Sequence, residues 1–268
     1  MAMCRLSIQG SLGNLIQPIF CKCGRITLIY NGEIYNWREI AQSHGILTPN
    51  CSDGDILAEL ICRYSDRAFG MLRGMFAIVC FDARIQRWKL VRDFFGMKPL
   101  YISKYKSSLR YSSEIRALVL SDSKKKWSIC EIGKNYFLSF GHLPPNCSGI
   151  QEIEIIQSNF IHCFDVSGNL VYKNEIDNSL LKDERQKNIK DSIYHSTKLH
   201  LESDTPIALM LSGGIDSALI AKNAQIMGKK LFCINLNSQV ENRESTMAEI
   251  IANTFGHEFI EVNILKKD

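Results

Sequence analysis

A phosphate-binding loop is predicted at Ser212-Gly213-Gly214-Ile215-Asp216-Ser217. The apolar run at 207–211 predicts a buried strand before it, and the residues from 218 onward predict a helix. Glycines let a backbone pass close to a bound group, while the amides and dipole at a helix start attract an anion. A plain strand-to-helix turn would need the glycines but not the two serines and the aspartate. The Lys-Ser/Thr end of a Walker loop is missing, so a kinase or GTPase site is not predicted.

A second group of polar residues follows the first expected strand, in Asn31-Gly32-Glu33-Ile34-Tyr35-Asn36. Alone, Asn-Gly predicts a tight turn, and Glu33 could be an ordinary surface carboxylate. Further segments accompany it in a fixed order: Ser52-Asp53, Leu72-Arg73-Gly74-Met75-Phe76-Ala77, Arg92-Asp93, Gly96-Met97-Lys98-Pro99-Leu100-Tyr101 and Ser113-Glu114-Ile115-Arg116-Ala117-Leu118.

Short strands dominate the chain from residue 1 to 165. One is expected at 25–30, and two hairpins are expected, from 75–82 with 88–93 and from 100–103 with 109–113. Helices are expected at 55–64 and 114–120. Strand pairs with helices laid on them predict an α+β sandwich as the first domain.

Residues 166–183 are rich in glycine, asparagine and mixed charge, and predict a linker. The domain expected at 184–268 alternates helix and strand. After a helix at 184–202 and the loop strand come a strand at 230–236, a helix at 245–255 and a strand at 258–264. This order predicts an α/β domain with a Rossmann-like parallel sheet and right-handed crossovers. Three strands are few for such a sheet, so the domain is expected to be incomplete.

The composition is that of a soluble globular protein, with 268 residues of which 46% are hydrophobic and 22% charged. The net charge of +4 is mild, and the basic run Lys124-Lys125-Lys126 predicts a solvated loop, so no nucleic-acid partner is expected. Neither a membrane span nor a secretion signal is expected, and the predicted location is the cytoplasm.

Ten cysteines are many for such a chain. Several lie in apolar segments, and the close pair Cys21-Lys22-Cys23 has no partner pair at zinc spacing. Free buried thiols in a reducing compartment are therefore expected.

The segments of the first half resemble the glutaminase domain of glutamine-hydrolysing asparagine synthetases, a class II amidotransferase with an N-terminal-nucleophile fold. The resemblance extends through Gly141-His142-Leu143-Pro144-Pro145 and Phe232-Cys233-Ile234, so it covers nearly all of the chain. The loop 212–217 resembles the pyrophosphate-binding loop of the ATP pyrophosphatase superfamily, whose members adenylate a substrate. The resemblance implies an ATP-dependent ligase that makes ammonia from glutamine, adenylates aspartate with Mg-ATP and lets ammonia displace AMP.

The resemblance also implies roles for single residues. Asn31 and the Gly32 amide would form an oxyanion hole. Glu33 and Asp53 would accept the glutamine α-ammonium, and Arg5 would bind the α-carboxylate. For ATP, Asp216 would hold Mg²⁺ on the leaving pyrophosphate. The remaining nucleotide-binding residues are implied to be Leu211, Ser212, Gly213, Gly214, Ser217 and Ile234.

Two departures from the family stand out. Members begin with a cysteine whose α-amine is the base for its own thiol. Several tens of residues then precede the segment that here starts at Arg5, so the nucleophile is expected to be absent, and Cys4 aligns only just before that arginine. The second pyrophosphate segment, its carboxylate and the catalytic base of the family lie downstream of residue 268. Within the loop itself, Ala218 replaces a serine. A fragment with impaired or no activity is therefore expected.

Other functions stay open. One is an enzyme like β-lactam synthetase, which adenylates another carboxylate and keeps a silent glutaminase domain. Another is a non-catalytic remnant that binds a ligand or a partner. The acceptor carboxylate is also open, as is the choice between a homodimer and association with the missing portions.

Overall fold

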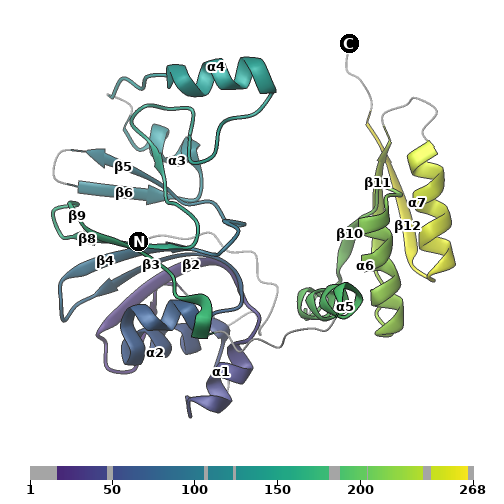
Figure 1. The fold of residues 1–268 in the computed structure, drawn as a ribbon, viewed down its shortest axis with the longest axis horizontal. Coiled ribbons are helices and arrows are strands. Elements are labelled where there is room, and N and C mark those ends of the chain that lie inside the picture. Colours follow the sequence, from purple (N-terminus) through teal and green to yellow (C-terminus); the bar gives the residue numbers. More distant parts are fainter. Residues whose placement is uncertain are drawn as a thin grey trace. The chain divides into compact units, whose positions relative to one another are not determined.

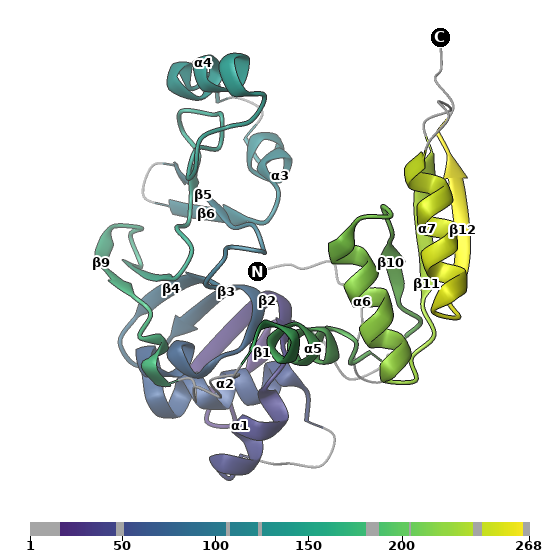
Figure 2. The ribbon, with the colours of Figure 1, turned by 45° about the vertical axis from the view of Figure 1, so that its right-hand side comes forward.

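The computed structural model describes residues 17–46, 51–105, 108–122, 125–180, 188–203, 205–237 and 243–264. The chain forms two compact units (Figures 1 and 2). The described residues up to 180 belong to the first unit, and those from 188 onward belong to the second. Among the residues that the structure describes, no helix has the length and apolar character needed to cross a membrane.

The first unit contains nine strands, four α-helices and two short 3₁₀ helices among its described residues. They are β1 (Ile19–Phe20), β2 (Ile26–Ile34), α1 (Trp37–Ser43), α2 (Asp53–Tyr64), η1 (Ser65–Met71), β3 (Gly74–Asp82), β4 (Arg87–Arg92), β5 (Tyr101–Tyr105), β6 (Ser108–Ser112), α3 (Ile115–Leu120), α4 (Glu131–Phe140), β7 (Glu154–Ile155), β8 (Phe160–Asp165), β9 (Leu170–Glu175) and η2 (Asn178–Leu180).

Six of these strands form one antiparallel sheet in the order β1-β2-β3-β4-β8-β9. Strands β2 and β3 pair along their whole length, from Ile26 opposite Asp82 to Ile34 opposite Gly74. Side chains alternate between the two faces, as the period of a strand requires. Leu28 and Ile78 thus pack in one core cluster, whereas their neighbour Val79 packs in another.

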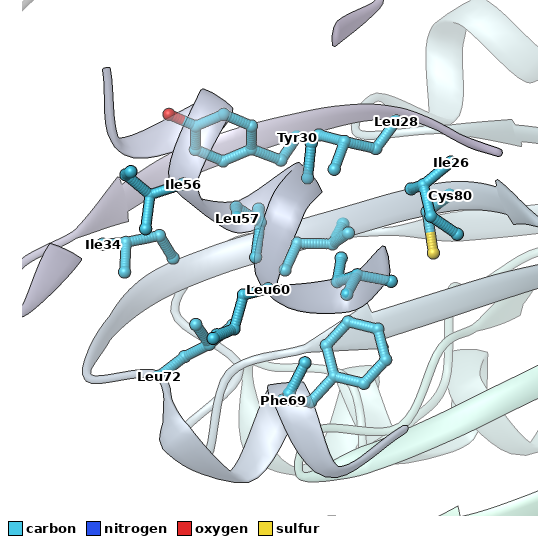
Figure 3. Packing of buried hydrophobic residues seen from close by; sticks show 14 of the residues in the cluster. Ile26, Leu28, Tyr30, Ile34, Ile56, Leu57, Leu60, Phe69, Leu72 and Cys80 are labelled. Carbon is cyan, nitrogen blue, oxygen red and sulfur yellow. The ribbon is translucent and has the colours of Figure 1, made fainter. Parts of the chain in front are cut away.

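Helix α2 covers one face of this sheet. Its start is fixed by a capping box, in which Asp55 N donates to Ser52 Oγ at 3.2 Å and Ser52 N donates to Asp55 Oδ2 at 2.9 Å. Figure 3 shows Leu57 and Leu60 of the helix packed against the side chains of β2, with Phe69 of η1 beside them. Burying each such side chain stabilises the fold by about 1.5–3 kcal/mol.

The opposite face of the six-stranded sheet packs against a smaller sheet of order β6-β5-β7. Leu90 of the large sheet and Ile102 of the small one share a core cluster with Ile156. Helices α3 and α4 lie beyond the small sheet, on the side away from α1 and α2 (Figures 1 and 2). The unit is therefore a layered α+β sandwich, and the fold class predicted for the first part of the chain is confirmed.

A charged side chain lies inside this unit. The Lys89 ammonium, with its side chain 2% exposed, lies 2.5 Å from the Asp66 carboxylate and donates to Ser65 Oγ at 2.9 Å. Tyr172 of β9 donates from its hydroxyl to the other Asp66 oxygen at 2.7 Å. Burial, followed by the Asp66 carboxylate, raises the pKa of Tyr172. The network joins β4, η1 and β9, so it fixes the end of α2 against the sheet.

The second unit is a parallel three-stranded sheet with helices. Its strands pair in the order β10-β11-β12. The elements are α5 (Ile189–His200), β10 (Ala208–Met210), α6 (Ile215–Ile226), β11 (Phe232–Asn237), α7 (Arg243–Thr254) and β12 (Glu258–Asn263). Buried Leu211, Leu231 and Cys233 form its core with alanines of α6 and α7. The predicted α/β class with a parallel sheet is confirmed.

Two expectations need correction. The first strand does not end at residue 30, because β2 continues to Ile34 and carries Asn31, Gly32 and Glu33 within the sheet. The region 166–183 is not only a linker, because it contains β9, which pairs with β8 in the six-stranded sheet. Strand β9 lies at the edge of the sheet and is mostly exposed, so its sequence shows none of the apolar alternation that marks a strand.

Candidate functional site

The Gly32 N–H lies on the outer edge of β2. Phe76 of β3 lies opposite Gly32, and both of its backbone groups are hydrogen-bonded to Asp93. The Phe76 N–H donates to Asp93 Oδ2 at 3.1 Å, and the Phe76 carbonyl accepts from Asp93 N at 2.9 Å. In an antiparallel ladder, a residue outside a hydrogen-bonded pair points its backbone groups away from the partner strand. The same alternation turns Tyr30 and Ile34 outward, and both have side-chain partners there, Gln17 and Asp53. Gly32 lies between them.

Only glycine fits at position 32. Its φ of +144° is open to few other residues, and a Cβ built there would lie 1.9 Å from the Met75 carbonyl oxygen and 2.7 Å from Phe76 Cα. The close approach of β3 therefore requires glycine. The close contact with β3 also fixes the backbone of Gly32 at this point of the strand.

Asn31 lines a cavity of about 510 Å³ between the two sheets. The register places it opposite Ala77, on the face that carries Val79 and the second core cluster. The other walls come from Leu100, Tyr111 and the start of α3. This cavity has room for an amino-acid ligand and contains one of the two predicted oxyanion donors.

Carboxylates gather where β2 ends. Asp53, the first residue of α2, accepts from Ile34 N at 3.3 Å and from Gly54 N at 2.9 Å, and is 6% exposed. Glu33 is 8% exposed and lies one residue from Ile34. Burial, then the charges of Glu33 and Asp93, raises the pKa of Tyr35 to about 12. This end of the sheet is therefore electronegative, which suits a cationic ligand group such as an ammonium.

Two further residues, for which the sequence predicts no role, hold this region together. Asp93 accepts from Met97 N at 2.9 Å and from Lys98 N at 3.2 Å, in addition to Phe76 N. Arg92 donates to three carbonyl oxygens, those of Lys98, Ile156 and Gly96, at 2.6–2.7 Å. An Arg-Asp pair at the end of a strand, followed by Gly96, was the signal that could have identified them.

The predicted phosphate loop joins β10 to α6. Gly214 is the N-cap of α6 and has no side-chain cap, so side chains leave the first amides of the helix available. The two serine hydroxyls face each other, with 3.4 Å between Ser212 Oγ and Ser217 Oγ, and Ser217 Oγ also donates to Gly214 O at 3.2 Å. Asp216 is exposed in the first helical turn. Amides, hydroxyls and a carboxylate thus meet at one helix start.

Gly213 brings the loop against α7. A Cβ at this position would lie 2.8 Å from the Glu244 carbonyl oxygen, and the φ of +79° also favours glycine. Leu211 donates its N–H to the Ile234 carbonyl at 2.9 Å, and its own carbonyl accepts from Asn235 Nδ2 at 2.7 Å. The Leu211 backbone is thus bonded within the unit. The Asn235 side chain is only 5% exposed, and its bond to Leu211 fixes the end of the strand from which the loop departs. The sequence alone did not predict this role.

The structure brings the predicted residues together in two sets. One set, in the first unit, contains Asn31, Gly32, Glu33 and Asp53. The other, in the second unit, contains Leu211, Ser212, Gly213, Gly214, Asp216, Ser217 and Ile234. Arg5 and Cys4 lie outside the described residues.

Comparisons with known proteins agree with this division. Residues 1–169 match the family model described as glutamine amidotransferase domain, and residues 188–268 match the model described as asparagine synthase. A relative, asparagine synthetase [glutamine-hydrolyzing] 1 of Bacillus subtilis, is 28% identical over 220 residues, which are 78% of this chain and 34% of the relative. Asparagine synthetase [glutamine-hydrolyzing] 2 of Oryza sativa subsp. japonica is 29% identical over 263 residues, 90% of this chain and 39% of that protein.

The chain thus spans between about a third and two fifths of the length of these curated relatives. Among solved structures, a glutamine phosphoribosylpyrophosphate amidotransferase from B. subtilis, complexed with ADP and GMP, is 15% identical. It aligns with a TM-score of 0.41 over 92% of this chain and 48% of that chain.

Proposed function

Because this chain belongs to the glutamine amidotransferase domain family, we propose that its first unit binds glutamine and its second unit binds ATP. Together they would serve an ATP-dependent enzyme that transfers glutamine-derived ammonia to aspartate, as the asparagine synthase match of the second unit suggests. The observation that carries the proposal is the position of Gly32 in β2, between Asn31, which lines the cavity, and Ile34, whose N–H donates to Asp53.

In the proposed glutamine site, the Gly32 N–H and the Asn31 side chain stabilise the negative oxygen that forms when the glutamine amide is attacked. Because these donors are held in place by β2 and β3, they need no rearrangement during the reaction. One such donor contributes roughly 3–4 kcal/mol to the transition state. Glu33 and Asp53 would bind the α-ammonium, and Arg5 the α-carboxylate, which fixes the amide next to the two donors.

In the proposed ATP site, the first amides of α6 and the two serine hydroxyls bind phosphate oxygens. The residues fit this ligand, because the start of α6 has no side-chain cap and the two serine hydroxyls lie beside it. Asp216 would hold Mg²⁺, since a carboxylate and phosphate oxygens together suit that ion. When bound, ATP supplies the activation of a carboxylate by adenylation. Aspartate-dependent release of pyrophosphate tests the acceptor.

The first prediction concerns Asp53→Asn. The variant should bind L-glutamine at least about tenfold more weakly, because loss of a charge-assisted bond of about 1.5–3 kcal/mol corresponds to such a factor. Calorimetry should compare L-glutamine with glutaramate, which keeps the amide and the carboxylate but has no α-ammonium. Glutaramate should bind equally weakly to the wild type and to Asp53→Asn.

The matched control is Glu39→Gln, which removes an exposed carboxylate from α1 of the same unit. It should bind glutamine like the wild type. An equal loss of glutamine and glutaramate affinity in Asp53→Asn would show that Asp53 acts through the fold of β2 and not on the ammonium.

The second prediction concerns Asp216→Asn in the loop. With Mg²⁺ present, the variant should bind ATP about tenfold more weakly than the wild type, because a hydrogen bond or metal contact of about 1.4 kcal/mol is lost. Without Mg²⁺, the two proteins should bind ATP alike, since the carboxylate then has no cation to hold. Isothermal calorimetry with and without a chelator measures both arms.

Glu249→Gln is the control for this experiment, because Glu249 is an exposed carboxylate on α7 of the same unit. It should behave as the wild type in both arms. If Asp216→Asn weakens ATP binding equally with and without Mg²⁺, Asp216 is not the metal ligand.

A further inference from the structure

Three cysteine thiols converge on the first unit. Cys21 and Cys23 lie in the turn between β1 and β2, and Cys62 lies in the last turns of α2. Cys23 Sγ is 3.5 Å from Cys21 Sγ and 3.4 Å from Cys62 Sγ, and the three sulfur atoms all lie within 4.8 Å of one another. The expectation of free thiols is confirmed for the described cysteines, but the expected burial is wrong for two of these three, because Cys23 is exposed and Cys62 is half-buried. Within the described ranges, no other His, Cys, Asp or Glu side chains form such a group.

The turn that carries two of these thiols is tightly bonded. Cys21 N donates to the Ile26 carbonyl at 3.0 Å, and Gly24 N donates to the Cys21 carbonyl at 2.9 Å. Ile26 N donates to Cys21 Sγ itself at 3.1 Å. Backbone N–H donors of this kind orient thiolate ligands and stabilise their charge. The turn therefore holds Cys21 and Cys23 in place whether or not a ligand is present.

Arg25 joins the turn to the third cysteine. Its Nη1 donates to the Cys62 carbonyl at 3.0 Å, while Nε and Nη2 bind the two oxygens of Asp82 at 2.9 and 2.5 Å. The guanidinium thus anchors the end of α2 beside the turn.

We propose that Cys21, Cys23 and Cys62 bind one Zn²⁺ ion as thiolates, with a water molecule as the fourth ligand. Tetrahedral zinc with sulfur at about 2.3 Å separates its sulfur atoms by about 3.8 Å. The Cys23 sulfur, at 3.5 and 3.4 Å from its two neighbours, needs to move away from each by only a few tenths of an ångström. Each thiol gives up its proton to solvent as its Zn–S bond forms, and no electrons are transferred. Exposed Cys23 gives the ion access from solvent and leaves room for the water.

A disulfide is the competing chemistry of this cluster. It would need a sulfur–sulfur distance of about 2.05 Å and could join only two of the three atoms. Cys23 lies almost equally close to both neighbours, which favours a ligand that contacts all three sulfurs over a bond to one of them.

Zinc titration of the reduced full chain against a chromophoric chelator tests the proposal. The wild type should bind one equivalent, and Cys23→Ser should lose at least about 100-fold in affinity, since even outer contacts of a site contribute tenfold or more. Cys130→Ser is the matched control, because Cys130 is half-buried in the same unit and outside the cluster. It should bind zinc like the wild type.

Zinc should also raise the unfolding midpoint of the first unit in the wild type and in Cys130→Ser, but not in Cys23→Ser. Tryptophan fluorescence reports this midpoint, since Trp37, Trp88 and Trp127 all lie in that unit. Equal zinc affinity in the wild type and Cys23→Ser would overturn the proposal. So would the absence of a zinc equivalent in the reduced wild type, or a disulfide within the cluster that forms in the presence of excess zinc.

Discussion

Gly32→Ala should destabilise the first unit by about 3–5 kcal/mol. The added Cβ cannot lie 1.9 Å from the Met75 carbonyl oxygen, so β2 and β3 must separate around this residue. The strained φ and the lost ladder hydrogen bonds both contribute to the loss. Because domains are stable by only about 5–15 kcal/mol, much of the stability of the unit disappears. Urea unfolding followed by tryptophan fluorescence measures the change.

Gly45→Ala is the control for this substitution. Gly45 also has a positive φ, of +61°, but a Cβ there meets no atom within 4 Å. Its loss should be only about 1 kcal/mol, which is the conformational cost alone. A similar loss in both variants would mean that the approach of β3 to Gly32 is looser than the structure shows.

Asp66→Ala should cost about 3–5 kcal/mol, because it leaves the buried Lys89 ammonium without its partner. The ammonium lies 2.5 Å from Asp66, and its remaining neutral contact is the Ser65 hydroxyl. Tyr172→Phe removes the phenol hydrogen bond to Asp66 and leaves the Lys89–Asp66 pair intact, so it should cost about 1 kcal/mol. The same fluorescence experiment measures both, since β4, η1 and β9 belong to the first unit.

The double variant Asp66→Ala/Lys89→Met separates charge from packing. Without the ammonium no unpaired charge remains, so the double variant should recover most of the loss. If it is as unstable as Asp66→Ala alone, the cost comes from lost contacts around η1 and not from the buried charge.

The sequence predicted well those elements whose own residues carry the pattern. The hairpins of β3 with β4 and of β5 with β6 were expected, because apolar side chains alternate along them and turn residues separate them. Helix α4 was missed, since most of its apolar side chains are exposed and show no stripe directed at the core. Strand β9 was missed for a similar reason.

Candidate site residues could likewise be predicted where the signal is local in the sequence, and not where it depends on the fold. The loop at 212–217 is contiguous, so its residue types could be interpreted without a fold. The direction of the Gly32 N–H follows from Asp93, which is distant in sequence and binds both backbone groups of Phe76 on the side of β3 away from β2. Cys62 reaches Cys23 across 39 positions, and no spacing rule connects them. Contacts of this kind become visible only when the strands and helices are placed.

The outer side of β2 also affects the solubility of the protein. An uncovered strand edge is a template on which a strand of another chain can add, and such edges promote aggregation. Here the Gln17 side chain imitates a neighbouring strand, since its amide both donates to the Tyr30 carbonyl and accepts from Tyr30 N–H. The Asp53 carboxylate accepts the Ile34 N–H, so this donor is also unavailable to an incoming strand. Between these two blocked positions the backbone groups of Gly32 face outward, so the described part of this edge is open at one residue only and resists an incoming strand.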